Sequence, residues 1–358
     1  RDTRSRKAAR RAEVAPLYTV EQARTSLGRL VAADYDAWIE PGAGVRCRFR
    51  DAGHILGSAI IEIDVGERGR MRRLVASGDI GQPMRPVLRD PVRIAHADYL
   101  CVESTYGNRA HRSFAATCEE LAVALRRTLE VDGGNVIIPA FAVGRTQEVL
   151  FVLADLVRAG RIGRLDVVVD SPMASAVTAL TVRHVDLWDD ETRALYAWAE
   201  ANSGCFRVRF VQDVEESMAL NAVKGGLVVI SASGMCDAGR IKHHLRYNLG
   251  RRECAVVIAG FQAAGTLGRR LVDGAHQVTL FGERIPVRAR IHTIGGLSAH
   301  ADQPALLDWL RGFGEAPRRT FVVHGEPAAA AAFVEAVEHE LGWSGVEAAQ
   351  AGVPVVLK

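Results

Sequence analysis

Two histidines, each placed at the end of an extended apolar run, constrain this sequence more than any other feature. His300 comes shortly after the run 287–294, and His324 ends the run 320–323. The segment between them, 303–313, has the apolar spacing of a helix. In α/β proteins, polar residues at the carboxyl ends of strands are where binding and chemistry occur. We therefore predict that two strand ends meet over one site, although either histidine alone fits an ordinary loop equally well.

The same pattern occurs near the start of the chain, where His54, Asp79 and Glu103 each lie where an extended segment ends. Imidazole nitrogen and carboxylate oxygen are ligands that suit zinc. A carboxylate can bridge two metals about 3.5–4 Å apart, which together activate water for phosphodiester displacement. Glu103 and His300 could form a carboxylate-oriented proton donor. Taken singly, His54 and Asp79 fit turn residues better, because spacing alone is weak evidence.

The strand pattern changes after Gly107. Before it, extended segments alternate apolar and polar residues. After it, continuous apolar runs such as 136–138, 167–169 and 255–258 alternate with helix-like segments. Strands buried on both faces and separated by helices indicate a parallel sheet in an α/β layer. A chain of 358 residues also favours two domains, with a boundary near Asn108.

Composition excludes several classes of protein. Hydrophobic residues make up 48% and charged residues 24%, which is typical of a globular protein. No apolar run reaches membrane-spanning length and no signal peptide opens the chain, so we expect a cytoplasmic protein without membrane contact. The six cysteines contain no C-x-x-C pair, which argues against a disulfide framework or a cysteine zinc site. Basic residues between Arg1 and Arg11 could bind nucleic acid, but a solvated helix face is the simpler interpretation.

Five motifs in order carry a resemblance to a known family. They are Asp51-Ala52-Gly53-His54, Ser77-Gly78-Asp79, Val102-Glu103-Ser104-Thr105-Tyr106-Gly107, Leu297-Ser298-Ala299-His300 and Val323-His324-Gly325-Glu326. Together they resemble the β-CASP family of the metallo-β-lactamase superfamily, whose members are RNA-cleaving metallohydrolases. The resemblance covers the whole chain and implies an α/β fold. Residues 1–107 would begin an αββα sandwich of lactamase type, 108–284 would form an inserted parallel-sheet β-CASP domain, and 285–358 would complete the sandwich.

The resemblance also implies a role for each site residue. His54 and His324 would bind zinc, Asp79 would bridge two Zn²⁺ ions, and Glu103 with His300 would donate the proton. The implied reaction is hydrolysis of RNA phosphodiester bonds by a metal-bound hydroxide, in RNA processing or degradation. RNA would lie in a cleft between the two lobes. The resemblance leaves open whether the protein is a monomer or a homodimer.

One departure from the family pattern affects the metal site. The family's His-x-His-x-Asp-His motif, which supplies most of the metal ligands, does not occur among the eleven histidines. The early strands of the lactamase-type half are also missing. We expect this motif to lie before Arg1, so that the sandwich is incomplete at its N-terminus and the 358-residue chain alone lacks part of its metal site and is inactive.

Several strand-end segments in the insert are candidates for RNA contact. Ser231, Ser233 and Gly234 follow a buried strand, where hydroxyl and backbone N–H groups could hold a phosphate. A plain N-cap by Ser233 explains the segment equally well. Arg145 could pair with phosphate or form a structural salt bridge. Thr266 opens a helix that we expect to face the cleft.

Two other functions remain compatible with the sequence. One is a non-catalytic RNA-processing scaffold of the same fold. The other is a small-molecule metallohydrolase such as a lactonase or thioesterase, which the large insert and the Glu103–His300 pair disfavour. The sequence does not distinguish endonuclease from exonuclease action.

The missing motif leads to a prediction about metal content. With only His54, Asp79 and His324 as ligands, the 358-residue chain should bind zinc weakly and substoichiometrically. A complete site would hold about two zinc ions per chain. Elemental analysis after extensive dialysis measures this directly, and two tightly held zinc ions in the 358-residue chain would refute the interpretation.

Overall fold

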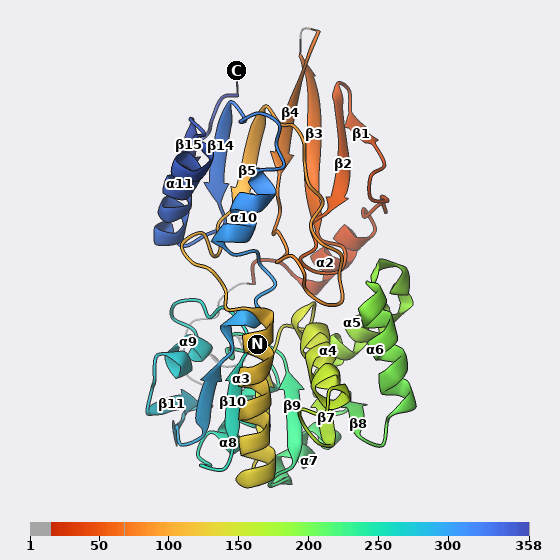
Figure 1. Cartoon of the computed structure of the whole chain (residues 1–358), viewed down its shortest axis with the longest axis vertical. Coiled ribbons are helices and arrows are strands. Elements are labelled where there is room, and N and C mark those ends of the chain that lie inside the picture. The colour runs from red at the N-terminus through yellow and green to blue at the C-terminus, as the bar shows by residue number, and fades with distance from the viewer. Residues whose placement is uncertain (1–15, 68, 358) are drawn as a thin grey trace.

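Two sheets organise the chain into two lobes, shown in the computed structural model of Figure 1, which describes residues 16–67 and 69–357. The first lobe contains a seven-stranded sheet with the order β1-β2-β3-β4-β5-β14-β15. The second contains a six-stranded sheet with the order β13-β10-β6-β9-β7-β8. The predicted basic segment between Arg1 and Arg11 lies outside the described residues.

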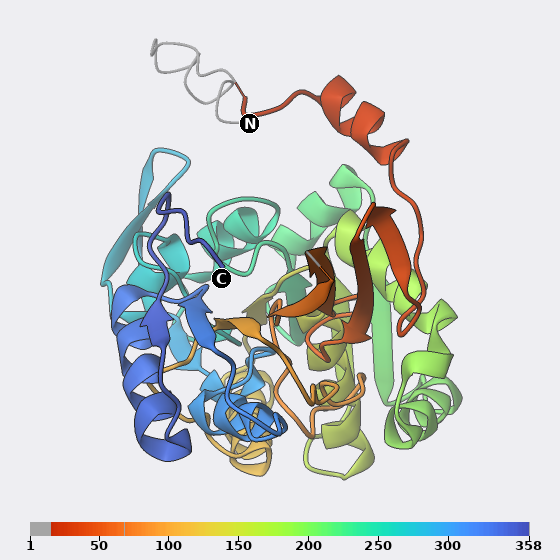
Figure 2. The same ribbon diagram turned by 90° about the horizontal axis from the view of Figure 1, so that it is seen from above.

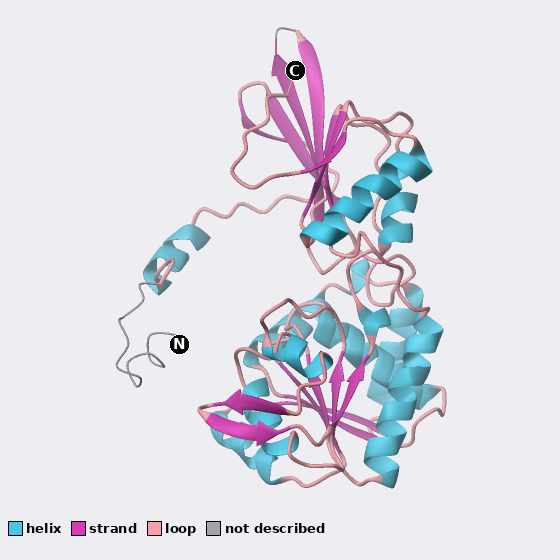
Figure 3. Cartoon of the chain, turned by 90° about the vertical axis from the view of Figure 1, so that its left-hand side faces the viewer, coloured by secondary structure: helices cyan, strands magenta, loops and turns pink. Residues whose placement is uncertain are grey.

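The first sheet is mixed, in agreement with its alternating sequence. Its strands are β1 (Ile39–Gly42), β2 (Val45–Asp51), β3 (Ala59–Glu67), β4 (Arg70–Ala76), β5 (Tyr99–Glu103), β14 (Arg319–Val323) and β15 (Val346–Ala348). Strands β1 to β4 pair antiparallel, whereas β4, β5, β14 and β15 pair parallel. Helices α10 (Gln303–Leu310) and α11 (Pro327–Leu341) cover one face (Figure 3). Leu100, Val102 and Phe333 are fully buried in the core between that face and the helices.

The opposite face of the first sheet is also apolar. Side chains alternate between the two faces of a strand, so Phe49, Ile63 and Leu74 lie on the face opposite to Ile60 and Val75. All three are only partly buried. The resemblance to an αββα sandwich predicts that a second sheet covers this face.

The second lobe has the predicted parallel sheet with helices between its strands. The strands are β6 (Val136–Pro139), β7 (Leu165–Val169), β8 (Phe206–Phe210), β9 (Leu227–Ser231), β10 (Ala255–Ile258) and β13 (Arg290–Thr293). The helices are α3 (Phe114–Arg126), α4 (Arg145–Arg158), α5 (Pro172–Arg183), α6 (Asp190–Ala201), α7 (Val214–Ala219), α8 (Ile241–Asn248) and α9 (Leu267–Val272). A separate hairpin joins β11 (Gln277–Leu280) to β12 (Glu283–Pro286). No described helix combines the length and apolar character that crossing a bilayer requires.

The chain returns to the first lobe later than the sequence indicated. We expected the return at residue 285, but β13 pairs in parallel with β10, from Ala255↔Arg290 to Ile258↔Thr293. Ile291 packs against the core of the second lobe. The parallel pairing and this apolar contact keep the segment in the six-stranded sheet up to Thr293.

Helix α2 (Val20–Leu27) is a short helix of 8 residues that precedes the first sheet. Thr19 begins it with a capping box, in which Thr19 and Gln22 each accept a hydrogen bond from the other's backbone N–H. The helix ends at Gly28, and none of its residues is buried. Figure 2 shows α2 lying apart from both lobes.

Asp170, which follows β7, ties three elements of the second lobe together. Its fully buried carboxylate accepts hydrogen bonds from Arg240 (2.7 Å), Ser217 (2.6 Å) and His244 (2.6 Å). The Ser231 hydroxyl donates to its backbone carbonyl at 2.9 Å. Burial alone would raise the pKa of Asp170, but the hydrogen bonds outweigh burial and lower it. The carboxylate is therefore ionised at neutral pH and holds α7 and α8 against β7, while the backbone carbonyl of Asp170 binds β9.

Removing this carboxylate should destabilise the second lobe strongly. Asp170→Ala leaves the Arg240 guanidinium without a counter-charge and His244 without its hydrogen-bond partner, so we expect a loss of about 3–5 kcal/mol in the free energy of unfolding. Asp166→Ala is the matched control, because Asp166 makes partly exposed ion pairs with Arg164 and Arg207. It should cost less than about 1 kcal/mol. Urea unfolding measures both, and equal losses would contradict this account.

Candidate metal centre

Two turns that pack directly against each other position His54 and Asp79. In the turn between β2 and β3, the Ser58 hydroxyl accepts hydrogen bonds from the backbone N–H of His54 at 3.1 Å and of Ile55 at 3.2 Å. The turn after β4 packs against this β2–β3 turn so closely that a Cβ at Gly81 would lie 1.9 Å from the Gly53 carbonyl oxygen. Only glycine permits this approach, which brings Asp79 to the side of His54.

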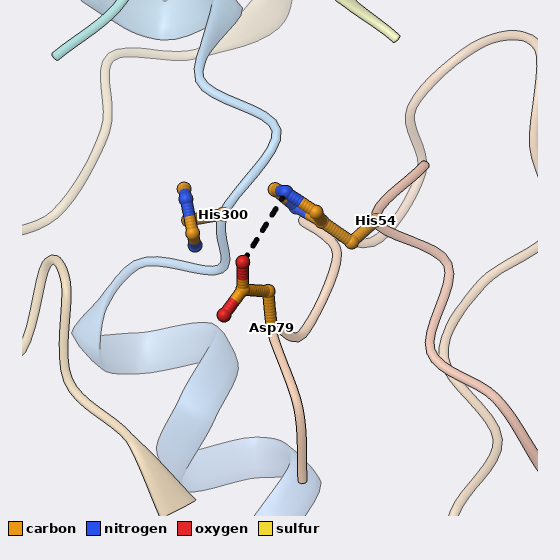
Figure 4. Close-up of side chains that lie close together, drawn as sticks. All are labelled: His54, Asp79 and His300. Carbon is orange, nitrogen blue, oxygen red and sulfur yellow. Dashed lines mark ion pairs between the residues drawn. The ribbon is translucent and has the colours of Figure 1, made fainter. Parts of the chain in front are cut away.

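Asp79 faces two histidines with different oxygens. Its Oδ2 lies 3.8 Å from His54 Nε2, the pair drawn in Figure 4, and its Oδ1 lies 3.4 Å from His324 Nδ1. The Asp79 and His324 side chains are 37% and 56% exposed, whereas that of His54 is 11% exposed. The cluster is therefore open to solvent on the side of His324. A carboxylate in this position is suited to bridge two cations.

His324 lies at a strained position just after β14. Its φ is +52°, a left-handed conformation that costs a residue other than glycine about 1–3 kcal/mol. The Thr105 hydroxyl lies 3.2 Å from the His324 carbonyl oxygen and 3.1 Å from Nδ1. Gly325 then passes the backbone of Ser104, where a Cβ would lie 2.6 Å from the carbonyl oxygen. Strain of this kind persists where the surrounding structure holds a functional group in place.

Glu103, which is buried, and His300, which is partly buried, form a pair beside the two other histidines. Glu103 is fully buried at the end of β5, and its oxygens lie 3.1 and 3.2 Å from His300 Nδ1. The same carboxylate accepts from the backbone N–H of Ile80 at 2.7 Å and of Thr105 at 3.3 Å. The His300 ring lies 4.3 Å from the His54 ring, centroid to centroid. All five predicted site residues thus meet where the two lobes join.

The pKa values of this pair move in opposite directions. Burial alone would raise the pKa of Glu103, but the hydrogen bond and the charge of His300 outweigh it and lower the pKa. Burial alone would lower the pKa of His300, but Glu103 outweighs it and raises the pKa. The pair therefore favours a carboxylate beside an imidazolium. Burial lowers the pKa of His54, which favours the neutral imidazole that a metal requires.

Sequence reasoning missed the residues that support His300. The His111 Nε2 donates to the His300 carbonyl oxygen at 3.0 Å, and the His111 backbone N–H donates to Asp302 at 2.7 Å. Gln82 accepts from the Asp302 backbone N–H at 2.9 Å. His111 comes only four residues after the Tyr106-Gly107 motif. This proximity was the one feature of the sequence that could have indicated a role for His111 at the site.

Arg85 is a second residue that the sequence did not single out. It lines a small pocket between the lobes together with His54 and Glu148. Its Nη1 is buried without a hydrogen-bond partner, and burial lowers the pKa of its guanidinium. A cation in this position beside the cluster suits a phosphate oxygen.

The residues proposed for RNA contact mostly have structural partners. Arg145 is 7% exposed and pairs with Glu148 at 2.6 Å, which favours the salt-bridge alternative. Ser231 is buried and bonded to Asp170. Thr266 caps α9 by accepting from the Arg269 N–H at 3.2 Å, and it donates to a backbone carbonyl.

Ser233 and Gly234 lie in the turn after β9. Ser233 is partly exposed and accepts weakly from the Ala238 N–H at 3.4 Å, while Gly234 is buried against the Phe141 ring. Of the five residues predicted to contact RNA, only Ser233 and Thr266 are partly exposed. Contact of any of the five with RNA remains a prediction.

The donor atoms of the cluster fit a zinc site. Atoms of His54, Asp79 and His300 lie within 4.8 Å of one another, and the same holds for Glu103, His300 and His324. Imidazole nitrogens with a single accessible carboxylate are the donor set that zinc prefers among divalent cations. His300 belongs to both groups, so geometry alone permits it to act as a ligand as well as a proton donor.

Comparison with known proteins places the chain in a family. A family model described as the Beta-Casp domain matches residues 146–271, and one described as the Zn-dependent metallo-hydrolase RNA specificity domain matches residues 284–346. The chain is 39% identical over 311 residues to Ribonuclease TTHA0252 of Thermus thermophilus, covering 87% of this chain and 69% of the relative. The chain belongs to the β-CASP family of the metallo-β-lactamase superfamily.

Two further β-CASP relatives are similar over most of this chain. An RNase J-like protein of Methanocaldococcus jannaschii is 30% identical over 285 residues, which cover 79% of this chain and 64% of the relative. Transcription termination factor FttA of Methanosarcina mazei is 28% identical over 328 residues, which cover 88% of this chain and 50% of the relative. This β-CASP chain thus spans about half to two thirds of the length of its relatives. The family resemblance predicted from the five motifs is confirmed.

Proposed function

We propose that this chain carries the catalytic groups of a zinc-dependent ribonuclease that hydrolyses RNA phosphodiester bonds. The observation that carries the proposal is the position of Asp79, whose two oxygens face His54 and His324 separately, close to the Glu103–His300 pair. The zinc-dependent hydrolase family model and the ribonuclease among the relatives support this chemistry.

Zinc would be held by His54, Asp79 and His324, with about two ions in a complete site. Bound zinc supplies a hydroxide at neutral pH and neutralises charge on the phosphate. His54 is held in place by Ser58, and His324 by Thr105 and Gly325. These contacts preorganise the ligands before the metal arrives.

His300 would protonate the leaving oxygen of the ribose. Its Nδ1 faces the Glu103 carboxylate, so its Nε2 is the nitrogen free to deliver a proton. The raised pKa of His300 keeps that proton in place near neutral pH. Glu103, ionised and buried, sets the ring orientation and stabilises the imidazolium. His111 fixes the backbone of His300 from the other side.

A second role for His300 has support of its own. Histidine ligands of zinc commonly donate their other ring nitrogen to a carboxylate, as His300 does to Glu103. In that case His300 would be a third histidine ligand. Zinc content, measured separately from rate, distinguishes the two roles.

The RNA would approach the exposed side of the cluster, with its phosphate near Arg85. RNA is the substrate class that we infer from the ribonuclease relatives. Because one relative is named a transcription termination factor, a role in termination is a second candidate. We further propose a cytoplasmic protein, since both of these roles act on cellular RNA.

Two substitutions should separate the proton donor from the metal ligand in zinc-loaded protein that cleaves RNA. His300→Ala should leave zinc content and RNA affinity nearly intact and slow cleavage by roughly 10²–10⁴-fold, the usual contribution of a general acid. His324→Asn should lower zinc content and activity together. Asparagine tolerates a positive φ, so this variant avoids added backbone strain.

A change of substrate provides the control for this assignment. An activated leaving group needs little protonation, so the loss in His300→Ala should largely disappear with it. Glu103→Gln should resemble His300→Ala, and the double variant should be much less impaired than the product of the two losses. If His300→Ala removes zinc, His300 is a ligand and the general-acid role is wrong.

A further inference from the structure

Phe281 occupies a backbone position that suits its side chain poorly. In the β11–β12 hairpin, Leu280 pairs with Glu283, so Phe281 and Gly282 form a two-residue turn with φ values of +53° and +85°. Such turns strongly favour Asn-Gly. A bulky residue with positive φ is a genuine outlier. Backbone strain of this kind points to a use for the side chain.

The Phe281 ring is not needed to fill a core. Its side chain is 48% exposed, and one face is stacked on the His243 ring, with centroids 4.5 Å apart and planes 29° apart. The Lys242 ammonium lies 5.2 Å from the ring centroid. Partial burial and then the neighbouring cations lower the pKa of His243, so it supports the ring as a neutral imidazole at neutral pH. The hairpin thus holds an exposed ring in a fixed orientation.

Helix α8 adds a second ring and a second cation beside the first. Lys242 and Arg246, and likewise His243 and Tyr247, are four positions apart and therefore share the outer face of the helix. Tyr247 is 46% exposed, and the Arg246 guanidinium lies 5.6 Å from its ring. Glu283 holds Arg246 in place through two hydrogen bonds of 3.0 and 2.6 Å.

Exposed rings alternating with cations match the chemistry of single-stranded nucleic acid, whose bases stack on aromatic side chains while its phosphates pair with cations. We propose that Lys242, His243, Arg246, Tyr247 and Phe281, which together we term the hairpin patch, form a second single-stranded RNA contact. Figure 1 places α8 and β11 at the end of the second lobe away from the first sheet, so the patch is remote from the metal centre. The choice of RNA as partner rests on the proposed function.

Phe281→Asn tests the patch because it should move binding and stability in different directions. Affinity for a fluorescent single-stranded RNA, measured by anisotropy in EDTA to prevent cleavage, should fall about tenfold, as expected from losing one stacked base. The melting temperature should stay the same or rise, since asparagine suits this turn. Phe281→Trp keeps a ring and should retain most of the affinity.

Charge in the patch is tested by a matched pair of lysine variants. Lys242→Gln should weaken binding and reduce the salt dependence by about one unit. Lys224→Gln removes the same charge from an exposed position outside the patch and should change neither. Unchanged affinity in Phe281→Asn, an equal loss in Phe281→Trp, or equal effects of the two lysine variants would overturn the proposal. The binding measurement is made in EDTA and does not depend on cleavage. It therefore remains valid even if the protein proves to have no ribonuclease activity.

Discussion

The burial of one carboxylate, that of Glu103, governs the geometry of the candidate site. An ionised carboxylate is costly to bury unless hydrogen bonds and an opposite charge compensate it. Glu103 obtains this compensation from the Ile80 and Thr105 N–H groups and from His300. Ile80 follows Asp79 directly, so the same bonds set the position of the proposed bridging ligand. A single buried charge thus fixes three loops, which follow β4, β5 and β13, relative to one another.

The connection between the lobes passes through His300. Strand β13 belongs to the six-stranded sheet and ends at Thr293, whereas α10 packs on the seven-stranded sheet and begins at Gln303. His300 lies on the short segment between them. It is held by Glu103 from the first lobe and by His111, which lies three residues before the start of α3 in the second lobe. Its orientation therefore depends on how the two lobes are placed. The proposed proton donor is thus positioned by residues from both lobes.

Strand ends could be predicted from the sequence because apolar runs bounded by glycine have a clear periodicity. That signal placed His54, Asp79, Glu103, His300 and His324 at strand ends, and the structure brings all five together. The same periodicity made Arg145 a candidate for RNA contact, because it also lies after a strand. In the structure, however, Arg145 is buried and paired with Glu148. Periodicity does not reveal which strand-end side chains find partners within their own lobe. It also gave no indication of Arg85, of the support from His111, or of the pairing that keeps β13 in the second sheet.

The most direct test of the central claim is anomalous diffraction at the zinc absorption edge, from crystals of the zinc-loaded protein. The account predicts zinc at the Asp79 carboxylate with the His54 and His324 nitrogens as ligands. It also predicts that His300 Nδ1 remains hydrogen-bonded to Glu103 and that Nε2 is free of metal. Zinc bound to His300, or zinc found only elsewhere, such as at Asp170 and His244, would contradict the account.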